Sequence, residues 1–179
     1  GASELLPIVG EVPVLFGLCA TDPHIQLDTY LDEIAENGFC GVINYPSISF
    51  LDGIYRESLE DMGINFEAEV EMISLARKKG LVTAAFVNTP EQCEKMIRAG
   101  GDIICVHFGL TRGGIMGAKK VLSLEAGAKR ARSIFEICDR LAPGAIKLVF
   151  GGPIKLPIDV KYMYDNTSTM GFMGGSTFD

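Results

Sequence analysis

Short apolar runs alternate with amphipathic segments along the whole chain, and this alternation constrains the fold more than any other feature. Segment 12–20 (VPVLFGLCA) is continuously apolar, as is typical of a strand buried on both faces of a sheet. Segment 28–38 (DTYLDEIAENG) then places apolar residues at helical spacing and stops at a glycine. The two patterns recur and predict strands at 12–20, 39–46, 81–88, 102–109, 145–153 and 170–176, and helices at 28–38, 66–80, 89–100, 123–141 and 156–166.

The predicted connections are long enough to return the chain to the same end of a sheet, so parallel strands are expected. The expected fold class is α/β, of the parallel (β/α)8 TIM-barrel type. Such a barrel usually needs at least about 200 residues, whereas this chain has 179 residues and six predicted strands. Either two units are missing or the sheet is open. The last strand has no following helix, which favours an incomplete barrel forming one domain over residues 1–179.

Charge and composition exclude several classes of partner. The net charge is -7, and the 16 Lys and Arg residues form no basic run, so a nucleic-acid partner is not expected. No apolar stretch approaches a membrane span, and the first residues do not resemble a signal peptide, so a cytoplasmic location is expected. The five cysteines form no C-x-x-C motif and are expected to be reduced core thiols rather than zinc ligands or disulfides.

Polar residues gather where the predicted strands end, which is where parallel α/β folds bind ligands. Asp22 follows the first predicted strand, and Asn44 and Asn88 lie at the carboxyl ends of the second and third, while the strand starts carry no comparable group. Asp and Asn after a strand are also common as turn or cap residues, and that interpretation stays open for each alone. His107 ends the fourth strand. It is either a core histidine or a functional group acting as a general acid or base, or stabilising an oxyanion.

Glycine pairs end the last two predicted strands. Gly151 and Gly152 close the fifth, while Gly174 and Gly175 precede Ser176 at the sixth. Such pairs either make tight turns or let an anion reach backbone N–H groups, and two in succession favour a phosphate site. No G-x-x-x-x-G-K-[ST] or G-x-G-x-x-G motif is present, which disfavours nucleoside triphosphates and dinucleotides.

Two loops add candidate ligand contacts. Segment 110–120 carries Thr111, Arg112 and Lys119, and is either a closing loop or a solvated crossover. In the long stretch 47–73, Arg56 would recognise a substrate carboxylate, with a surface ion pair to Asp52 as the alternative. The acidic residues at 67, 69 and 71 cannot share one helix face, so no metal site is built from them.

Several motifs together resemble the phosphoenolpyruvate hydrolase-like family of TIM-barrel proteins, which is grouped with the phosphoenolpyruvate/pyruvate-binding barrels. They include PVLFGLCATDP, GFCGVINYPSISFLDGIYRESLEDMG, AGGDIICVHFGLT, GGPIKLPIDVKYMYDNT and GFMGGST. The resemblance implies that the chain supplies strands three to eight of a (β/α)8 barrel. It departs from the family pattern where Val149 and Phe150 precede Gly151, because the family usually has a histidine there.

The resemblance implies an enzyme that acts on a small phosphorylated or phosphonylated keto or enol acid and cleaves a P–O, P–C or C–C bond. Asp22 would hold Mg2+ or another divalent cation, and His107 would be the acid or base. The expected substrate-binding residues are Asn44, Asn88, Arg56, Thr111, Gly151, Gly152, Gly174, Gly175 and Ser176.

A non-catalytic metabolite-binding or regulatory barrel is the alternative. A Schiff-base aldolase is disfavoured because Lys147 lies near the start of its strand. An incomplete barrel exposes sheet edges and apolar faces, so a homo-oligomer is also expected.

Overall fold

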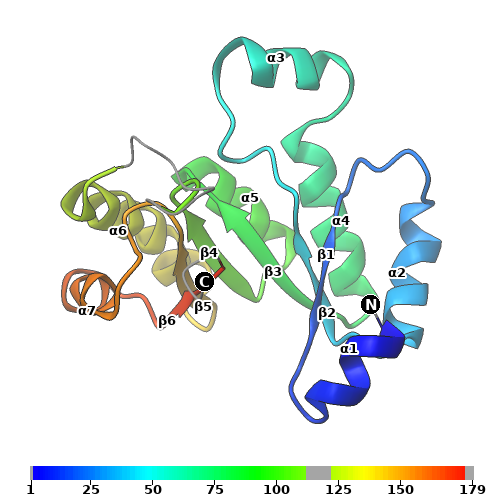
Figure 1. Cartoon of the computed structure of the whole chain (residues 1–179). Coiled ribbons are helices and arrows are strands. Elements are labelled where there is room, and N and C mark those ends of the chain that lie inside the picture. The colour runs from blue at the N-terminus through cyan, green and yellow to red at the C-terminus, as the bar shows by residue number, and fades with distance from the viewer. Residues whose placement is uncertain (1, 112–121, 176–179) are drawn as a thin grey trace.

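The computed structural model describes residues 2–111 and 122–175, and within them one parallel sheet organises the chain (Figure 1). Its six strands lie side by side in the order in which they occur in the sequence. The strands are β1 (Leu15–Leu18), β2 (Gly41–Asn44), β3 (Val82–Val87), β4 (Ile103–His107), β5 (Ile146–Phe150) and β6 (Gly171–Met173). The helices are α1 (Ala2–Val9), α2 (Leu27–Glu36), α3 (Gly53–Asp61), α4 (Phe66–Lys78), α5 (Pro90–Ala99), α6 (Leu124–Leu141) and α7 (Pro157–Asn166).

Every neighbouring pair of strands is parallel, so all six carboxyl ends lie along one edge of the sheet. Helix α4 packs against β2 and β3, α5 against β3 and β4, and α6 against β4 and β5. Each of these helices therefore covers the strands that it connects, and together they line one face of the curved sheet (Figure 1). The prediction of a parallel α/β fold is confirmed.

The main core lies between the sheet and these helices. Strand residues Val42, Val106 and Val149 are fully buried on the helix-facing side. They pack in one continuous cluster with fully buried helix residues, among them Leu31, Met72, Ile73, Met96 and Ile134. Burying an aliphatic or methionine side chain stabilises the folded state by roughly 1.5–3 kcal/mol, so this layer fixes the sheet on which the strand ends are arranged.

Helix ends follow the local signals in the sequence. The Thr89 side chain accepts a hydrogen bond from the Gln92 backbone N–H, and the Gln92 side-chain oxygen accepts one from the Thr89 backbone N–H, which makes a capping box with Pro90 in the first turn. Gly100 ends the same helix with a φ of 100°, a conformation that residues with a Cβ atom seldom adopt. The predicted helix 89–100 is confirmed nearly to the residue for this reason.

Helices α1 and α3 have no counterpart in the sequence prediction. Neither contains a buried residue, so neither has the fully buried face that marks the core helices. Helix α3 contacts the core through the partly buried Leu59, and the Arg56–Glu60 pair one turn apart adds local support. It projects beyond the carboxyl edge of the sheet (Figure 1).

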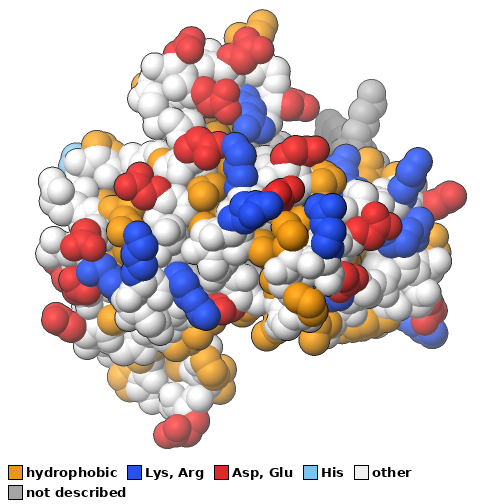
Figure 2. All heavy atoms as spheres, turned by 180° about the vertical axis from the view of Figure 1, so that it is seen from behind, with side chains coloured by type: hydrophobic (Ala, Val, Ile, Leu, Met, Phe, Trp, Pro, Cys, Tyr) orange, Lys and Arg blue, Asp and Glu red, His pale blue; other side chains and the backbone are white. Residues whose placement is uncertain are grey.

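Charged side chains of both signs are mixed on the side opposite to the view of Figure 1 (Figure 2). Charged side chains of the described residues also pair: Lys79 contacts Asp28 and Asp32, and Arg77 contacts Asp102. Within residues 2–111 and 122–175, no helix is long and apolar enough to cross a membrane.

Candidate functional site

His107 and three phenylalanines form a cluster at the carboxyl ends of β3, β4 and β5. Phe86 and Phe150 extend from the strands on either side of His107, and their ring centroids lie 5.0 Å and 4.8 Å from the imidazole. The third ring, Phe50, comes from the loop after β2 and stacks on the imidazole at 4.5 Å with an interplanar angle of 12°. The register places His107 opposite Phe150 on the face that the helices do not cover.

The hydrogen bonding of His107 defines which nitrogen is left for a ligand. Its Nδ1 accepts the backbone N–H of Gly109 at 2.9 Å, so the proton of the neutral imidazole resides on Nε2. Nε2 has no hydrogen-bond partner among the described residues. Among the side-chain N and O atoms of these residues, Ser49 Oγ is the only one that is fully buried and has no partner. Because Nε2 has no partner either, it is not fully buried and keeps some access to solvent.

The aromatic surroundings of His107 also set its charge. The residue is 2% exposed, and this burial lowers the pKa of His107 from 6.5 to about 4. The imidazole is therefore neutral at pH 7, and its free Nε2–H is a hydrogen-bond donor at the carboxyl end of the sheet.

Asn88 holds the end of the strand that carries His107. Its side-chain Nδ2 donates to the His107 carbonyl at 2.9 Å, while its Oδ1 accepts from Arg130 of α6 at 3.1 Å. The Asn88 backbone N–H donates to the Gln92 side chain. Asn88 thus lies beside His107 as the sequence predicts, and its amide ties strand and helix together. A contact between Asn88 and a substrate stays a prediction.

Asn44 lies on the opposite, helix-facing side of the sheet. Its Oδ1 accepts the backbone N–H of Phe86 at 2.6 Å, and its Nδ2 donates to Glu69 of α4 at 2.5 Å and to the Phe86 carbonyl at 3.2 Å. The side chain therefore extends the β2–β3 ladder beyond its last residue pair. Asn44 and His107 do not converge in this structure, and a substrate contact of Asn44 stays a prediction.

Glu69 is a buried carboxylate that sequence reasoning did not select. It is 4% exposed and accepts hydrogen bonds from the Ile48 backbone N–H, the Ser47 hydroxyl and Asn44, each within 2.8 Å. Desolvation raises the pKa of Glu69, although these hydrogen bonds oppose the effect. The sequence signal was present but ambiguous, because acidic residues in the first turn of a helix normally complement its dipole.

Glu69 and Gln92 anchor the loop that carries Phe50. Gln92 Nε2 donates to the Ser49 carbonyl at 3.2 Å, while Glu69 holds Ser47 and Ile48. These contacts fix the loop next to the strand ends, where Phe50 stacks on the imidazole. A cavity of about 320 Å³ lies beside this loop, at the carboxyl ends of β1 and β2; its lining includes Cys19, Thr21, Pro46, Phe50 and Glu69.

The glycine pair after β5 lies against the loop that follows β4. Gly151 has a φ of 72°, and a Cβ there would stand 2.3 Å from the Gly109 carbonyl oxygen. Gly152 has a φ of 56°, and its Cβ would stand 2.5 Å from the Cβ of Phe108. The Gly152 N–H already donates to the Gly109 carbonyl at 3.1 Å. The close approach of the chain itself therefore explains both glycines, and phosphate binding by them stays a prediction.

Three more predicted substrate-binding residues, Thr111, Gly174 and Gly175, lie near the same strand ends. Thr111 is buried, and its backbone nitrogen lies 4.0 Å from the position of a Cβ on Gly151. Gly174 follows β6 directly, and a Cβ on Gly175 would stand 3.4 Å from the ring of Phe150. Ser176 lies outside the described residues, as do Arg112 and Lys119.

Asp22 and Arg56 form hydrogen bonds only with residues close to them in the sequence, although the Arg56 charge also acts on Glu69. Asp22 Oδ1 accepts the His24 backbone N–H at 2.9 Å in the loop after β1, and Arg56 pairs with Glu60 on α3. The described residues bring together no group of three His, Cys, Asp or Glu side chains that could hold a metal ion. Asp22 alone does not make a protein site for Mg2+, since other ligands would have to come from water and substrate. No chemical step is therefore assigned to a metal here.

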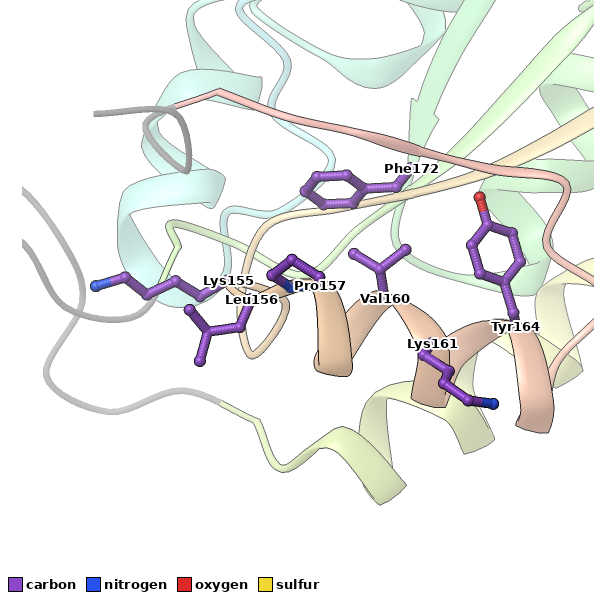
Figure 3. A pocket seen from close by; sticks show the side chains of 7 residues that line it. All are labelled: Lys155, Leu156, Pro157, Val160, Lys161, Tyr164 and Phe172. Carbon is purple, nitrogen blue, oxygen red and sulfur yellow. The ribbon is translucent and has the colours of Figure 1, made fainter.

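An apolar groove of about 480 Å³ lies apart from this cluster, between α7 and β6 (Figure 3). Val160 and Phe172 line it, and its charged groups are Lys155 and Lys161, whose ammonium groups point away from its centre (Figure 3). The groove contains neither His107 nor the glycine pair, so it is not the candidate site.

Comparison with solved structures supports the TIM-barrel assignment. One is 2,3-dimethylmalate lyase, described as a PEP mutase/isocitrate lyase superfamily member, with a TM-score of 0.59 and 11% identity over 90% of this chain and 57% of that one. Another is oxaloacetate acetylhydrolase bound to 3,3-difluorooxalacetate, with a TM-score of 0.60 and 14% identity over 91% and 58%. At these identities the likeness concerns the fold alone, and it confirms the predicted fold class.

Sequence comparison identifies closer relatives. The ToMV resistance protein Tm-1(GCR237) of Solanum lycopersicum is 41% identical over 179 residues, which are 99% of this chain and 24% of that protein. The ToMV susceptible protein tm-1(GCR26) of the same plant matches equally well. The chain thus spans about a quarter of the length of these curated relatives. The family model described as phosphoenolpyruvate hydrolase-like matches residues 1–179. This chain therefore belongs to the phosphoenolpyruvate hydrolase-like family, as its motifs predicted.

Proposed function

We propose that the protein is an enzyme that binds a small phosphorylated or phosphonylated keto or enol acid at the carboxyl ends of β3 to β6. The observation that carries the proposal is the state of His107, a neutral imidazole whose Nδ1 is occupied and whose Nε2 has no hydrogen-bond partner among residues 2–111 and 122–175. Membership of the phosphoenolpyruvate hydrolase-like family supports the substrate class, and the fold supports the location, because barrels of this type bind ligands at that edge.

The low pKa of His107 favours oxyanion stabilisation over general acid or base catalysis. A group with a pKa of about 4 is almost entirely deprotonated at pH 7, and it is a weak base. A neutral imidazole nevertheless donates a good hydrogen bond from Nε2. Breaking a bond next to a keto or enol group places negative charge on an oxygen, and a fixed donor in a dry site stabilises that charge. His107 is therefore assigned as the donor to the developing enolate oxygen.

The rings around His107 keep the donor oriented. Phe50, Phe86 and Phe150 contact the imidazole, and the Gly109 N–H fixes its tautomer. Phe150 stands beside the position at which the family usually carries a histidine, so this chain has an apolar wall there. The wall strengthens electrostatic interactions at Nε2 because it limits the access of water.

A divalent cation stays part of the proposal as a requirement to be tested. Asp22 is the candidate ligand, and a bound Mg2+ would supply additional positive charge for an anionic substrate. The roles proposed for His107 and for the rings around it do not depend on this cation.

A non-catalytic metabolite-binding or regulatory domain is the second candidate. It is favoured by the internal use of predicted site groups, since the Asn44 amide and the Gly152 N–H are already hydrogen-bonded within the protein. The relatives are also named for virus resistance and susceptibility rather than for a reaction.

Substitution of His107 in the full-length protein distinguishes the two candidates. Phosphate and pyruvate release from phosphoenolpyruvate would be measured with and without Mg2+. His107→Asn keeps an acceptor for the Gly109 N–H but removes the Nε2 donor, and we expect kcat to fall about 10²- to 10³-fold. His107→Gln places an amide donor near Nε2 and should retain more activity. His24→Asn changes the other, exposed histidine and is the matched control.

Turnover that survives unchanged in His107→Asn would refute the assigned role. Binding of phosphoenolpyruvate without any release of product, measured by calorimetry, would instead establish the second candidate.

A further inference from the structure

Two cysteines from different helices place their sulfur atoms in contact behind the sheet. Cys93 of α5 and Cys138 of α6 lie with their sulfurs 3.5 Å apart, although 45 positions separate them in the sequence. Both residues are buried, and the Cys93 thiol also lies 3.6 Å from the Ile134 carbonyl. A disulfide bond has an S–S length of about 2.05 Å, so the two sulfurs need to approach by only about 1.5 Å.

The surroundings of the pair favour a reactive thiolate at Cys138. The hydrogen bond shared with the Cys93 thiol lowers the pKa of Cys138, and the nearby Lys147 ammonium lowers it further, against the opposing effect of burial. The same hydrogen bond and burial raise the pKa of Cys93. Lys147 is itself almost buried and pairs with Asp139 at 2.5 Å. Lys147 of β5 and Asp139 of α6 act on Cys138, whereas Glu94 of α5 acts on Cys93, so the two thiols lie in different electrostatic environments.

We propose that Cys93 and Cys138 are a modification site, at which a peroxide or a comparable two-electron oxidant forms a reversible disulfide between α5 and α6. The Cys138 thiolate attacks a peroxide oxygen, the O–O bond breaks, and a sulfenic acid forms; the departing hydroxide takes up the proton that the thiol released and leaves as water. The Cys93 sulfur then attacks the Cys138 sulfur, the S–S bond forms, the S–O bond breaks, and the second water leaves. Two thiols and one hydrogen peroxide yield one disulfide and two waters, and an external dithiol reverses the reaction.

The position of Cys138 provides a route for the oxidant. It lies in the last turn of α6, which ends at Leu141, and the neighbouring side chains of Asp139 and Arg140 are exposed. Helix ends open more readily than helix centres, so brief fraying of this turn exposes the sulfur. We therefore expect oxidation to be slower than that of an exposed thiol.

The disulfide would add a covalent link between helices that already meet at the candidate site. Arg130 of α6 holds Asn88, which lies two residues before the start of α5, and Asn88 holds the His107 carbonyl. The inference does not depend on the proposed reaction, because it concerns only the helices behind the sheet.

Peptide mapping tests the proposal directly. The full-length protein would be treated with hydrogen peroxide or diamide, alkylated, digested with trypsin and analysed by mass spectrometry without reduction. Cleavage after Lys and Arg places Cys93 in peptide 80–95 and Cys138 in peptide 133–140. We expect these two peptides to appear linked in most of the molecules, to separate on treatment with dithiothreitol, and to remain unlinked in Cys138→Ser.

Cys105 provides the control. It is buried like the pair, but it makes no sulfur contact with another described cysteine, so Cys105→Ser should not change the linkage. A protein in which the wild-type peptides stay unlinked, or in which Cys138 proceeds to sulfinic or sulfonic acid without joining Cys93, would overturn the inference.

Discussion

The glycine pair after β5 provides the sharpest test of how this site is built. In Gly152→Ala the new Cβ would stand 2.5 Å from the Phe108 Cβ and 2.9 Å from the Phe108 carbonyl oxygen, at a φ of 56°. A left-handed conformation costs a residue with a Cβ atom roughly 1–2 kcal/mol, and forcing an extra carbon into a packed site costs typically 1–3 kcal/mol. We expect the free energy of unfolding to fall by about 3–4 kcal/mol.

Other glycines of this chain separate the two contributions. Gly144→Ala has open space and no left-handed φ, so it should be neutral, or stabilising by up to about 1 kcal/mol because the unfolded chain loses entropy. Gly80→Ala has open space at a φ of 79° and reports the backbone cost alone, about 1 kcal/mol. In Gly41→Ala the new Cβ would stand 2.0 Å from the Val82 carbonyl oxygen without a left-handed φ, so this variant reports the steric cost.

Urea unfolding followed by circular dichroism measures the series. The midpoints should rank Gly144→Ala above Gly80→Ala and Gly80→Ala above Gly152→Ala at a constant slope, because only stability changes. For a chain of this size the largest effect corresponds to a fall in Tm of about 10 °C. If Gly152→Ala is no less stable than Gly80→Ala, the approach of Phe108 does not require the glycine, and a ligand becomes its explanation.

The site makes two further predictions, and the incomplete barrel makes a third. Asn44→Ala leaves both backbone groups of Phe86 without partners, so the free energy of unfolding in urea should fall by about 2–4 kcal/mol. The control Asn37→Ala changes an exposed residue and should cost under about 1 kcal/mol; equal effects would contradict the hydrogen-bond network of Asn44. The folded-state pKa of His107 is depressed to about 4, so its contribution to stability, about 3 kcal/mol, is present above pH 6.5 and is lost as the pH falls towards 4. In measurements of the free energy of unfolding from pH 4 to 7, His107→Phe should flatten the dependence on pH. An unchanged slope would count against the depressed pKa. Light scattering tests the expected homo-oligomer, and a monomeric mass at micromolar concentration would reject it.

Glu69 adds an opposite pH dependence. Burial raises the pKa of Glu69 in the folded state. The contribution of Glu69 to stability is therefore greatest below its pKa of 4.5 in the unfolded chain, and it declines as the pH rises through the folded-state pKa. This window overlaps that of His107, so Glu69→Gln should make the net rise in stability with pH steeper.

The sequence by itself determined the architecture, because the signals for helices and strands are local. Apolar periodicity identified the strands and the core helices, and the Thr89 cap with its proline located α5 closely. It also located the polar residues at the carboxyl ends, since in parallel strands these ends share one edge. Periodicity did not reveal α1 and α3, which bury no residue.

Only the tertiary structure decided what the individual side chains do. Asn44 ends β2 and His107 ends β4, but their side chains face opposite sides of the sheet. That difference depends on the exact register of each strand. The charge of His107 depends on Phe50, which a loop held by Glu69 brings from another part of the chain. The contact between Cys93 and Cys138 spans 45 positions and exists only because α5 and α6 pack together. Side-chain environment is a property of non-local contacts, and no local pattern in the sequence encodes it.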